Sequence, residues 1–230
     1  MLFTERVATL ITIKEHGTLE DYYNHFPLTD YFSFDICPYT SIVKFESNEE
    51  ILCEGEKPDY LYYLIDGRAK LFISQGNGRI SLINFINAPC FVGEMELIGA
   101  QDTANGIMAI TPCTCYAIRI EKCKDRILND TKFLRYLCLF LSQKAIRNTY
   151  NYSKNQAYPL EIRLAKFILM TSCNRLYREN HTEVSEFLGV TYRHLLYVLA
   201  DFVKRGLLAK TKQGYFIQDI STLRNIAEIK

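Results

Sequence analysis

Residues 181–199 contain two short helical patterns separated by a single glycine, and this feature restricts the fold more than any other part of the chain. Gly189 lies between the patterns, where the turn needs a positive φ that only glycine adopts cheaply. We expect the first helix to run from Thr182, as its N-cap, to Leu188, and Thr191 to cap the second helix. The small Ser185 lies where the helices would pass closely. The spacing predicts a helix-turn-helix whose core-facing residues are Val184, Leu188, Val190, Leu195 and Val198.

This arrangement leaves four side chains on the outer face of the second helix, namely Tyr192, Arg193, His194 and Tyr197. An arginine can bind a guanine edge through two hydrogen bonds, a contact worth about 1–3 kcal/mol of discrimination. Tyrosine and histidine side chains can donate to phosphates or pack on thymine methyl groups. We therefore predict that this helix reads double-stranded DNA. The alternative is a helical hairpin whose outer face is only solvated.

Two short strands after the helix-turn-helix predict a wing beside the reading helix. Residues 207–210 and 215–217 are the strands, and residues 211–214 join them in a hairpin. Lys210 and Lys212 would touch backbone phosphates and add salt dependence, and Lys204 and Arg205 either do the same or are solvated. Residues 160–230 have a net charge of +4 and residues 1–159 one of −3, which favours a polyanionic partner for the C-terminal part. The predicted DNA-contacting residues are Thr182, Thr191, Tyr192, Arg193, His194, Tyr197, Lys210 and Lys212.

The N-terminal half is typical of a small β-roll preceded by a helical segment. Apolar residues at Val7, Leu10, Ile11 and Ile13 indicate a helix within residues 1–35. Residues 40–120 contain short strand-like runs separated by turn signals. Asp66-Gly67, between the runs 60–65 and 69–73, predicts a hairpin with a type I′ turn. Residues 76–78 mark a second turn, before a strand over 80–86. Such strands predict a roll or barrel.

Residues 122–152 change to a helical period, with apolar residues three and four positions apart. A helix of this length would span about 45 Å, and its apolar stripe favours a helix partner from a second subunit. The alternative is burial within one chain. Tyr158-Pro159 interrupts the helix. We therefore predict an α+β protein with three parts: an effector-sensing β-roll over residues 1–121, a dimerisation helix over 122–156 and a winged helix-turn-helix over 157–230.

Several motifs of the chain resemble the Crp/Fnr superfamily of bacterial regulators, over nearly its whole length. In the roll the resemblance depends on Glu54-Gly55, on residues 63–70 and on residues 91–94, which look like the start of the family's phosphate-binding cassette. The reading helix, residues 190–199, is most similar to the YeiL branch. The resemblance implies a jelly roll of the cyclic-nucleotide-binding type. It also implies a homodimer docked through the long helices, a two-fold symmetric operator with half-sites roughly 34 Å apart, and RNA polymerase as a partner.

The chain departs from the family pattern at two places. Relatives that bind cyclic nucleotides carry an arginine near the end of the cassette, whereas residues 102–106 contain none, and no Lys or Arg occurs between Arg79 and Arg119. A phosphate would lack its charge-assisted bond, so we predict that cyclic AMP does not bind tightly. The reading helix has Tyr192, Arg193 and Tyr197 where the family places Arg, Glu and Arg, which implies a different operator. Residues proposed to line an effector pocket are Gly93, Glu94, Thr103, Ala104 and Asn105. The alternative is that Gly93 only makes a tight turn and that Glu94 is partly solvated.

The sequence offers weak support for a metal or prosthetic group. Only four histidines exist, and none lies between residues 40 and 120, which argues against haem held by histidine and against a metal-dependent enzyme in the roll. An iron–sulfur cluster needs about four convergent thiolates. The eight cysteines lack the family's N-terminal cluster, so packing is favoured for Cys113 and Cys115, and a cluster or thiol redox sensing stays open as the alternative.

The remaining alternatives concern the class of function. No nucleophile–base pair or P-loop is recognisable, so we predict that the chain is not an enzyme. No run of 18 apolar residues occurs, which predicts no membrane span, and the charged N-terminus favours a cytoplasmic protein. The main alternative to a DNA-binding regulator is a small-molecule or redox-sensing module whose C-terminal domain mediates protein contacts.

Overall fold

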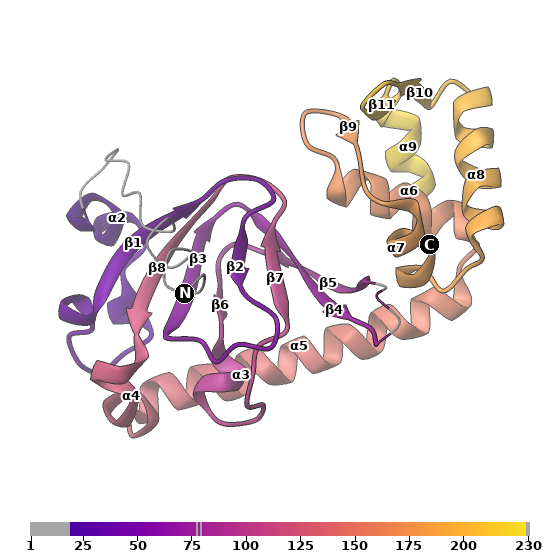
Figure 1. The fold of residues 1–230 in the computed structure, drawn as a ribbon. Coiled ribbons are helices and arrows are strands. Elements are labelled where there is room, and N and C mark those ends of the chain that lie inside the picture. Colours follow the sequence, from indigo (N-terminus) through magenta and orange to yellow (C-terminus); the bar gives the residue numbers. More distant parts are fainter. Residues whose placement is uncertain (1–18, 77, 79, 229–230) are drawn as a thin grey trace, which may run out of the picture. The chain divides into compact units, whose positions relative to one another are not determined.

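The computed structural model describes residues 19–76, 78 and 80–228 (Figure 1). The chain forms two compact units: residues up to Ser74 together with Asn84–Ser142, and Gln75–Ile83 together with the residues from Gln143 onward. The helical pattern predicted around Val7 and Ile13 lies outside the described residues. The predicted α+β class is confirmed, because the first unit contains a β-roll and the second a winged helix-turn-helix.

The first unit is a roll built from two four-stranded sheets, ordered β1-β8-β3-β6 and β2-β7-β4-β5. Most strands that are neighbours in a sheet are distant in the sequence. Strand β1, for example, pairs with β8 from Thr40↔Ile118 to Phe45↔Cys113. The strands are β1 (Thr40–Phe45), β2 (Glu50–Leu52), β3 (Tyr60–Asp66), β4 (Arg68–Ser74), β5 (Ile80–Asn87), β6 (Cys90–Val92), β7 (Gly106–Ala109) and β8 (Cys113–Arg119). The predicted strand over 80–86 is therefore confirmed as β5.

The hairpin predicted at Asp66-Gly67 is wrong. Strand β3 pairs with β6 and β8, while β4 pairs with β7, so the chain passes here from one sheet to the other. Gly67 has a φ of +98°, and a Cβ atom there would lie 2.5 Å from the carbonyl oxygen of Pro112. The Asp-Gly pair thus marks a sheet-to-sheet connection, in which both the positive φ and the close backbone approach require glycine.

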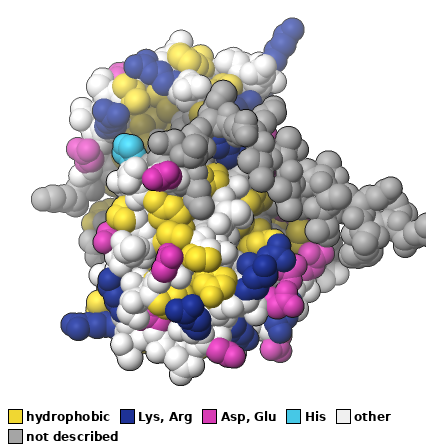
Figure 2. All heavy atoms as spheres, turned by 90° about the vertical axis from the view of Figure 1, so that its left-hand side faces the viewer, with side chains coloured by type: hydrophobic (Ala, Val, Ile, Leu, Met, Phe, Trp, Pro, Cys, Tyr) yellow, Lys and Arg dark blue, Asp and Glu magenta, His cyan; other side chains and the backbone are white. Residues whose placement is uncertain are grey.

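The two faces of the β1-β8-β3-β6 sheet contact different apolar clusters, because successive side chains of a strand point to opposite faces. Leu64 and Cys115 belong to the cluster between the sheets, which also contains Leu52, Val92 and Ile107. The other cluster is largely aromatic and includes Leu28, Phe32, Tyr63, Phe91, Tyr116 and Phe133. On the face of the molecule shown in Figure 2, hydrophobic side chains are interspersed with both basic and acidic ones.

The single helix predicted from residue 122 is divided in two. Helix α4 (Ile120–Leu128) ends before Asn129, and α5 (Thr131–Ala157) begins after Asp130. The Asp130 carboxylate is buried and accepts hydrogen bonds from the backbone N–H groups of Lys132 (2.9 Å) and Ser33 (2.7 Å). This carboxylate caps the start of α5, while Asn129 is the C-cap of α4. The other helices of this unit are α2 (Leu19–His25), the 3-10 turns Leu28–Asp30 and Cys37–Tyr39, and α3 (Glu94–Leu97).

After the end of α5, the described part of the second unit contains four helices and a small sheet with the order β10-β11-β9. As predicted, Tyr158-Pro159 separates α5 from the next helix, and Pro159 is the N-cap of that helix. The core is formed by Leu164, Phe167, Tyr177, Leu195, Leu199 and Phe202, all of which are nearly inaccessible to solvent. The elements are α6 (Leu160–Thr171), β9 (Leu176–Tyr177), α7 (His181–Phe187), α8 (Tyr192–Lys204), β10 (Leu208–Thr211), β11 (Gly214–Ile217) and α9 (Ile220–Ala227).

Candidate nucleic-acid interface and sensor site

The N-cap of the first helix of the predicted helix-turn-helix lies two residues earlier than expected. Asn180, and not Thr182, is the N-cap of α7, and its Oδ1 accepts a hydrogen bond of 2.9 Å from the Thr182 N–H. Thr182 itself is exposed in the first turn. The buried Ser185 donates from Oγ to the Thr182 carbonyl oxygen at 2.8 Å. Its hydroxyl group therefore has a hydrogen-bond partner although it is buried inside the motif.

The turn between α7 and α8 has the glycine geometry that the sequence predicts. Gly189 has a φ of +63°, and a Cβ atom there would meet no other atom within 4 Å. Arg163 of α6 donates from Nη1 to the carbonyl oxygen of Leu188 and from Nε to that of Tyr158, the latter at 3.0 Å. Burial lowers the pKa of the Arg163 guanidinium. Sequence reasoning missed this residue, because its acceptor on Leu188 is distant in the sequence.

The outer face of α8 carries the side chains that the sequence predicts. Thr191 caps the helix, and its Oγ1 accepts a hydrogen bond of 3.2 Å from the His194 N–H. Tyr192 and Tyr197 have 50% and 73% of their surface exposed, and Arg193 and His194 are also exposed. The inner face is buried through Leu195, Val198, Leu199 and Phe202. The burial of these residues fixes the helix and leaves the outer row accessible.

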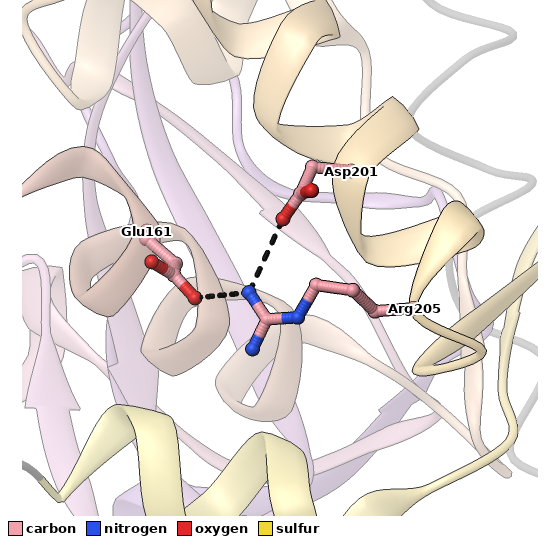
Figure 3. A network of polar contacts seen from close by, with 3 residues as sticks. All are labelled: Glu161, Asp201 and Arg205. Carbon is pink, nitrogen blue, oxygen red and sulfur yellow. Dashed lines mark hydrogen bonds and ion pairs between the residues drawn. The ribbon is translucent and has the colours of Figure 1, made fainter.

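The C-terminal end of α8 is joined to α6 by a small ion-pair network (Figure 3). Arg205 Nη1 lies 2.5 Å from Glu161 Oε1 and 3.1 Å from Asp201 Oδ2. These side chains are about 40% exposed, so each pair contributes little stability by itself. The network pairs Arg205 with carboxylates, so this residue is not merely a solvated cation, and its contact with a phosphate stays a prediction.

The wing has the predicted hairpin form. Strands β10 and β11 pair antiparallel from Leu208↔Ile217 to Thr211↔Gly214, and Lys210 and Lys212 are exposed at and near the tip. Gly214 has a φ of +132°, and a Cβ atom there would lie 2.2 Å from the Tyr177 carbonyl oxygen. His181 packs between the rings of Tyr177 and Tyr215 at centroid distances of 6.1 and 5.7 Å. These ring contacts thus pack the wing strand β11 against β9 and the start of α7.

The predicted effector residues of the roll come from two segments beside the apolar cluster between the sheets. Gly93, with a φ of +89°, is the N-cap of the short helix α3, and Glu94 is only 3% exposed. Ala104 is buried and exchanges backbone hydrogen bonds of 2.8 Å with Gly55 and Glu56. Thr103 is exposed and Asn105 half-buried. A Cβ atom on Gly93 would lie 3.9 Å from Leu52, a member with Ala104 of that same cluster.

The roll cysteines lie in a largely apolar environment. Cys90, Cys113 and Cys115 belong to the cluster between the sheets, and Cys113 donates from Sγ to the Thr111 carbonyl oxygen at 3.2 Å. Burial raises the pKa of Cys113 to about 11 and that of Cys115 well above its ordinary value. Such thiols are weak nucleophiles. Among the residues that the structure describes, no three His, Cys, Asp or Glu side chains are arranged to hold a metal ion.

A jelly roll of this strand order, a long helix and a winged helix-turn-helix together define a class of regulators with a cyclic-nucleotide-binding type of sensor. Residues 42–130 match the cyclic nucleotide-binding domain family. The chain is 46% identical over 198 residues to Regulatory protein YeiL of Escherichia coli O157:H7, which covers 86% of this chain and 90% of that protein. The chain therefore belongs to the Crp/Fnr family of transcriptional regulators, and its resemblance to the YeiL branch is confirmed.

More distant relatives agree with this assignment. The cAMP-activated global transcriptional regulator CRP of Escherichia coli O6:H1 is 28% identical over 104 residues, 45% of this chain and 50% of that protein. A crp/fnr-family transcriptional regulator from Eubacterium rectale has a TM-score of 0.73 at 15% identity, covering 90% of this chain and 100% of that one. A CRP-family regulator from Thermus thermophilus has a TM-score of 0.62 at 20% identity, covering 81% of this chain and 96% of that one. These two structures support the fold alone.

The helices do not meet the requirements of a bilayer span. Within the described part of the chain, none combines the length and the apolar character that crossing a membrane requires.

Proposed function

We propose that this protein is a sequence-specific DNA-binding transcription regulator that acts in the cytoplasm as a homodimer. The observation that carries the proposal is the outer face of α8, where Tyr192, Arg193, His194 and Tyr197 are all exposed on a helix whose other face is buried. A capped helix with this division can enter a major groove without losing its own core contacts. Thr182, Thr191, Lys210 and Lys212 lie on the flanking elements and would bind phosphates.

The apolar stripe predicted over residues 122–152 is partly buried within the chain itself, since Ile127 and Leu137 belong to the aromatic cluster of the roll, but a different row of α5 supports the dimer. The helix α5 carries an exposed row with alternating spacings of four and three residues, Arg135, Leu139, Ser142, Ile146 and Thr149. Leu139 and Ile146 have 57% and 69% of their surface exposed, which is costly for large apolar side chains in water. A repeat of this spacing is the seam through which two helices pack in a coiled coil. A second copy of α5 is the proposed occupant, and two-fold symmetry then implies a two-fold symmetric operator.

The roll would sense something other than cyclic AMP. The relative CRP is named as cAMP-activated, but the cassette of this chain offers the carboxylates Glu94, Glu96 and Asp102 and no cation between residues 79 and 119. Glu94 is buried, so a phosphate beside it would be repelled at short range. Calorimetric titration should detect no micromolar binding of cyclic AMP. A micromolar affinity would overturn this part of the proposal.

Selection of duplexes from a random pool, at physiological salt, tests the proposal as a whole. The wild-type protein should enrich a two-fold symmetric sequence with half-sites roughly 34 Å apart. Arg193→Ala should lower affinity for that sequence about tenfold to 100-fold, since it loses a two-bond guanine contact. The matched control Arg224→Ala removes one exposed arginine from α9 and should bind as the wild type does. No enrichment would instead support a C-terminal domain that contacts proteins. With the operator in hand, transcription assays can test contact with RNA polymerase.

The dimer has its own test in the purified protein. Leu139→Glu together with Ile146→Glu places charges on the exposed row of α5, which should convert a dimer to a monomer in sedimentation equilibrium because the like charges would face each other. Lys122→Glu adds the same charge to an exposed position of α4 and should leave the dimer unchanged. A wild-type protein that sediments as a monomer would refute the homodimer.

A further inference from the structure

The outer face of α8 has an unusual chemical composition for a surface that reads bases. Between residues 191 and 200 it exposes Tyr192, Tyr197 and a single permanently charged side chain, Arg193. Those ten residues contain no carboxylate, Asn or Gln. The next carboxylate, Asp201, is 3.1 Å from Arg205 Nη1 in the network of Figure 3. The face therefore offers one permanently charged donor group and two large aromatic rings, together with the smaller polar side chains of Thr191 and His194.

This composition restricts which base edges the face can recognise. The amino group of cytosine is read by an acceptor such as Glu or Asp, and adenine by the paired donor and acceptor of Asn or Gln. The described outer face of α8 offers neither kind of side chain up to residue 200. Among the largest side chains of the face, what remains is an arginine for the two acceptors of guanine and the ring surface of the tyrosines for the methyl group of thymine.

The spacing of Arg193 and Tyr197 places these two functions side by side. Residues four apart on a helix lie on one face, about 6 Å apart along the axis. Base pairs are stacked about 3.4 Å apart, so the two side chains would reach positions one or two base pairs from each other. Tyr197 is the more exposed of the two tyrosines, at 73% against 50% for Tyr192, so more of its ring surface is open to a ligand.

We propose that Tyr197 is a specificity-determining residue that recognises the 5-methyl group of a thymine located one or two base pairs from a guanine bound by Arg193. The inference rests on the proposed function, because it concerns how the same helix reads DNA. The ring of Tyr197 provides the recognition and its hydroxyl group is dispensable. Each half-site therefore contains a guanine and a nearby thymine whose methyl group contributes affinity.

The experiment uses the full-length protein and the duplex that the selection yields. Each thymine in turn is replaced by uracil, which removes only the 5-methyl group, and each guanine by 7-deazaguanine, which removes one acceptor. For the wild type, uracil at one position per half-site should weaken binding about fourfold, the factor for burying one methyl-sized group. 7-Deazaguanine one or two base pairs away should weaken it about tenfold, within the range for a two-bond arginine contact.

Two variants assign the methyl contact to Tyr197. Tyr197→Phe keeps the ring and should keep the fourfold response to uracil, whereas Tyr197→Ala should bind thymine and uracil duplexes equally and retain the response to 7-deazaguanine. Because Tyr197 is largely exposed, both variants should unfold at the wild-type temperature. Wild-type binding that is insensitive to uracil everywhere, or an undiminished uracil response in Tyr197→Ala, would overturn the inference while DNA binding stands. Failure of the wild type to bind any duplex specifically would overturn the proposed function as well.

Discussion

The two candidate sites of this protein are assembled in opposite ways. The proposed DNA-reading surface comes from one continuous segment, residues 180–217, whose caps, turn glycine and helix period all act locally. The candidate effector site of the roll combines the segment at Gly93 with the segment at Ala104, and strands from both sheets border it. Local signals are readable in a single sequence, whereas strand order is set by which surfaces bury one another. This difference predicts that substitutions in the roll, where distant segments meet, cost more stability than matched substitutions in the DNA-reading segment.

Two glycines with positive φ should show the largest contrast in stability. Gly67→Ala places a Cβ atom 2.5 Å from the Pro112 carbonyl oxygen and 2.8 Å from Cys113, which adds a steric clash to the left-handed backbone and should cost about 3 kcal/mol or more. Gly189→Ala meets open space and should cost only about 1 kcal/mol. Urea unfolding of the wild type and both variants measures the change in the free energy of unfolding. Equal losses would show that backbone conformation alone governs both positions.

The same division explains how much the sequence revealed. Helix α8 was predictable because Thr191, Gly189 and the apolar period agree at short range. The hairpin at Asp66-Gly67 was wrong because that signal describes a turn and says nothing of which strands pair across it. The break at Asn129-Asp130 was missed because the apolar period continues through it, and the buried Asp130 is identified only by its distant partner Ser33. Arg163 was missed for a similar reason, since its acceptor Leu188 is 25 residues away.

The helix caps provide a second contrast, of intermediate size. Asp130 is 4% exposed and accepts backbone hydrogen bonds from Ser33 and Lys132. Asp130→Ala removes two hydrogen bonds to a buried, charged acceptor and should cost about 2–3 kcal/mol. Thr191→Ala removes one exposed cap from α8 and should cost about 1 kcal/mol. Chemical denaturation of the two variants tests the order, and a larger loss for Thr191→Ala would contradict it.

The pKa of Asp130 gives this contrast a pH dependence. Burial raises that pKa, but hydrogen bonds from the backbone of Ser33, Lys132 and Phe133 outweigh burial, and the pKa is lowered. A carboxyl group with a lowered folded pKa stabilises the protein above its unfolded pKa and loses this contribution as the pH falls through the folded value. The stability difference between wild type and Asp130→Ala should therefore shrink below about pH 4. A difference that stays constant down to pH 2 would contradict the capping role.

The start of α7 offers a smaller test within the winged helix. The structure identifies Asn180 as the N-cap, with Thr182 supplying the N–H that it accepts. Asn180→Ala should cost about 1 kcal/mol, whereas Thr182→Ala keeps the backbone donor and should change stability by less than about 0.5 kcal/mol. Thr182→Ala should instead lower DNA affinity, because Thr182 is one of the proposed phosphate contacts. Thermal unfolding and operator binding of both variants separate the two effects, and the reverse order of stabilities would restore Thr182 as the cap.

The smallest expected effect is a pH dependence at the contact of α7 with the wing. Burial between Tyr177 and Tyr215, and then the charge of Lys210, lower the pKa of His181 from its usual 6.5. The unfolded chain therefore binds a proton at His181 before the folded chain does, so stability should fall as the pH drops below 6.5 toward the folded value, and be unaffected above it. His181→Gln should flatten this part of the curve of melting temperature against pH, while His194→Gln, on the outer face of α8, should leave it intact because His181 is still present. If His181→Gln retains the full slope between pH 7 and pH 5, the aromatic enclosure of this histidine does not influence the stability of the wing.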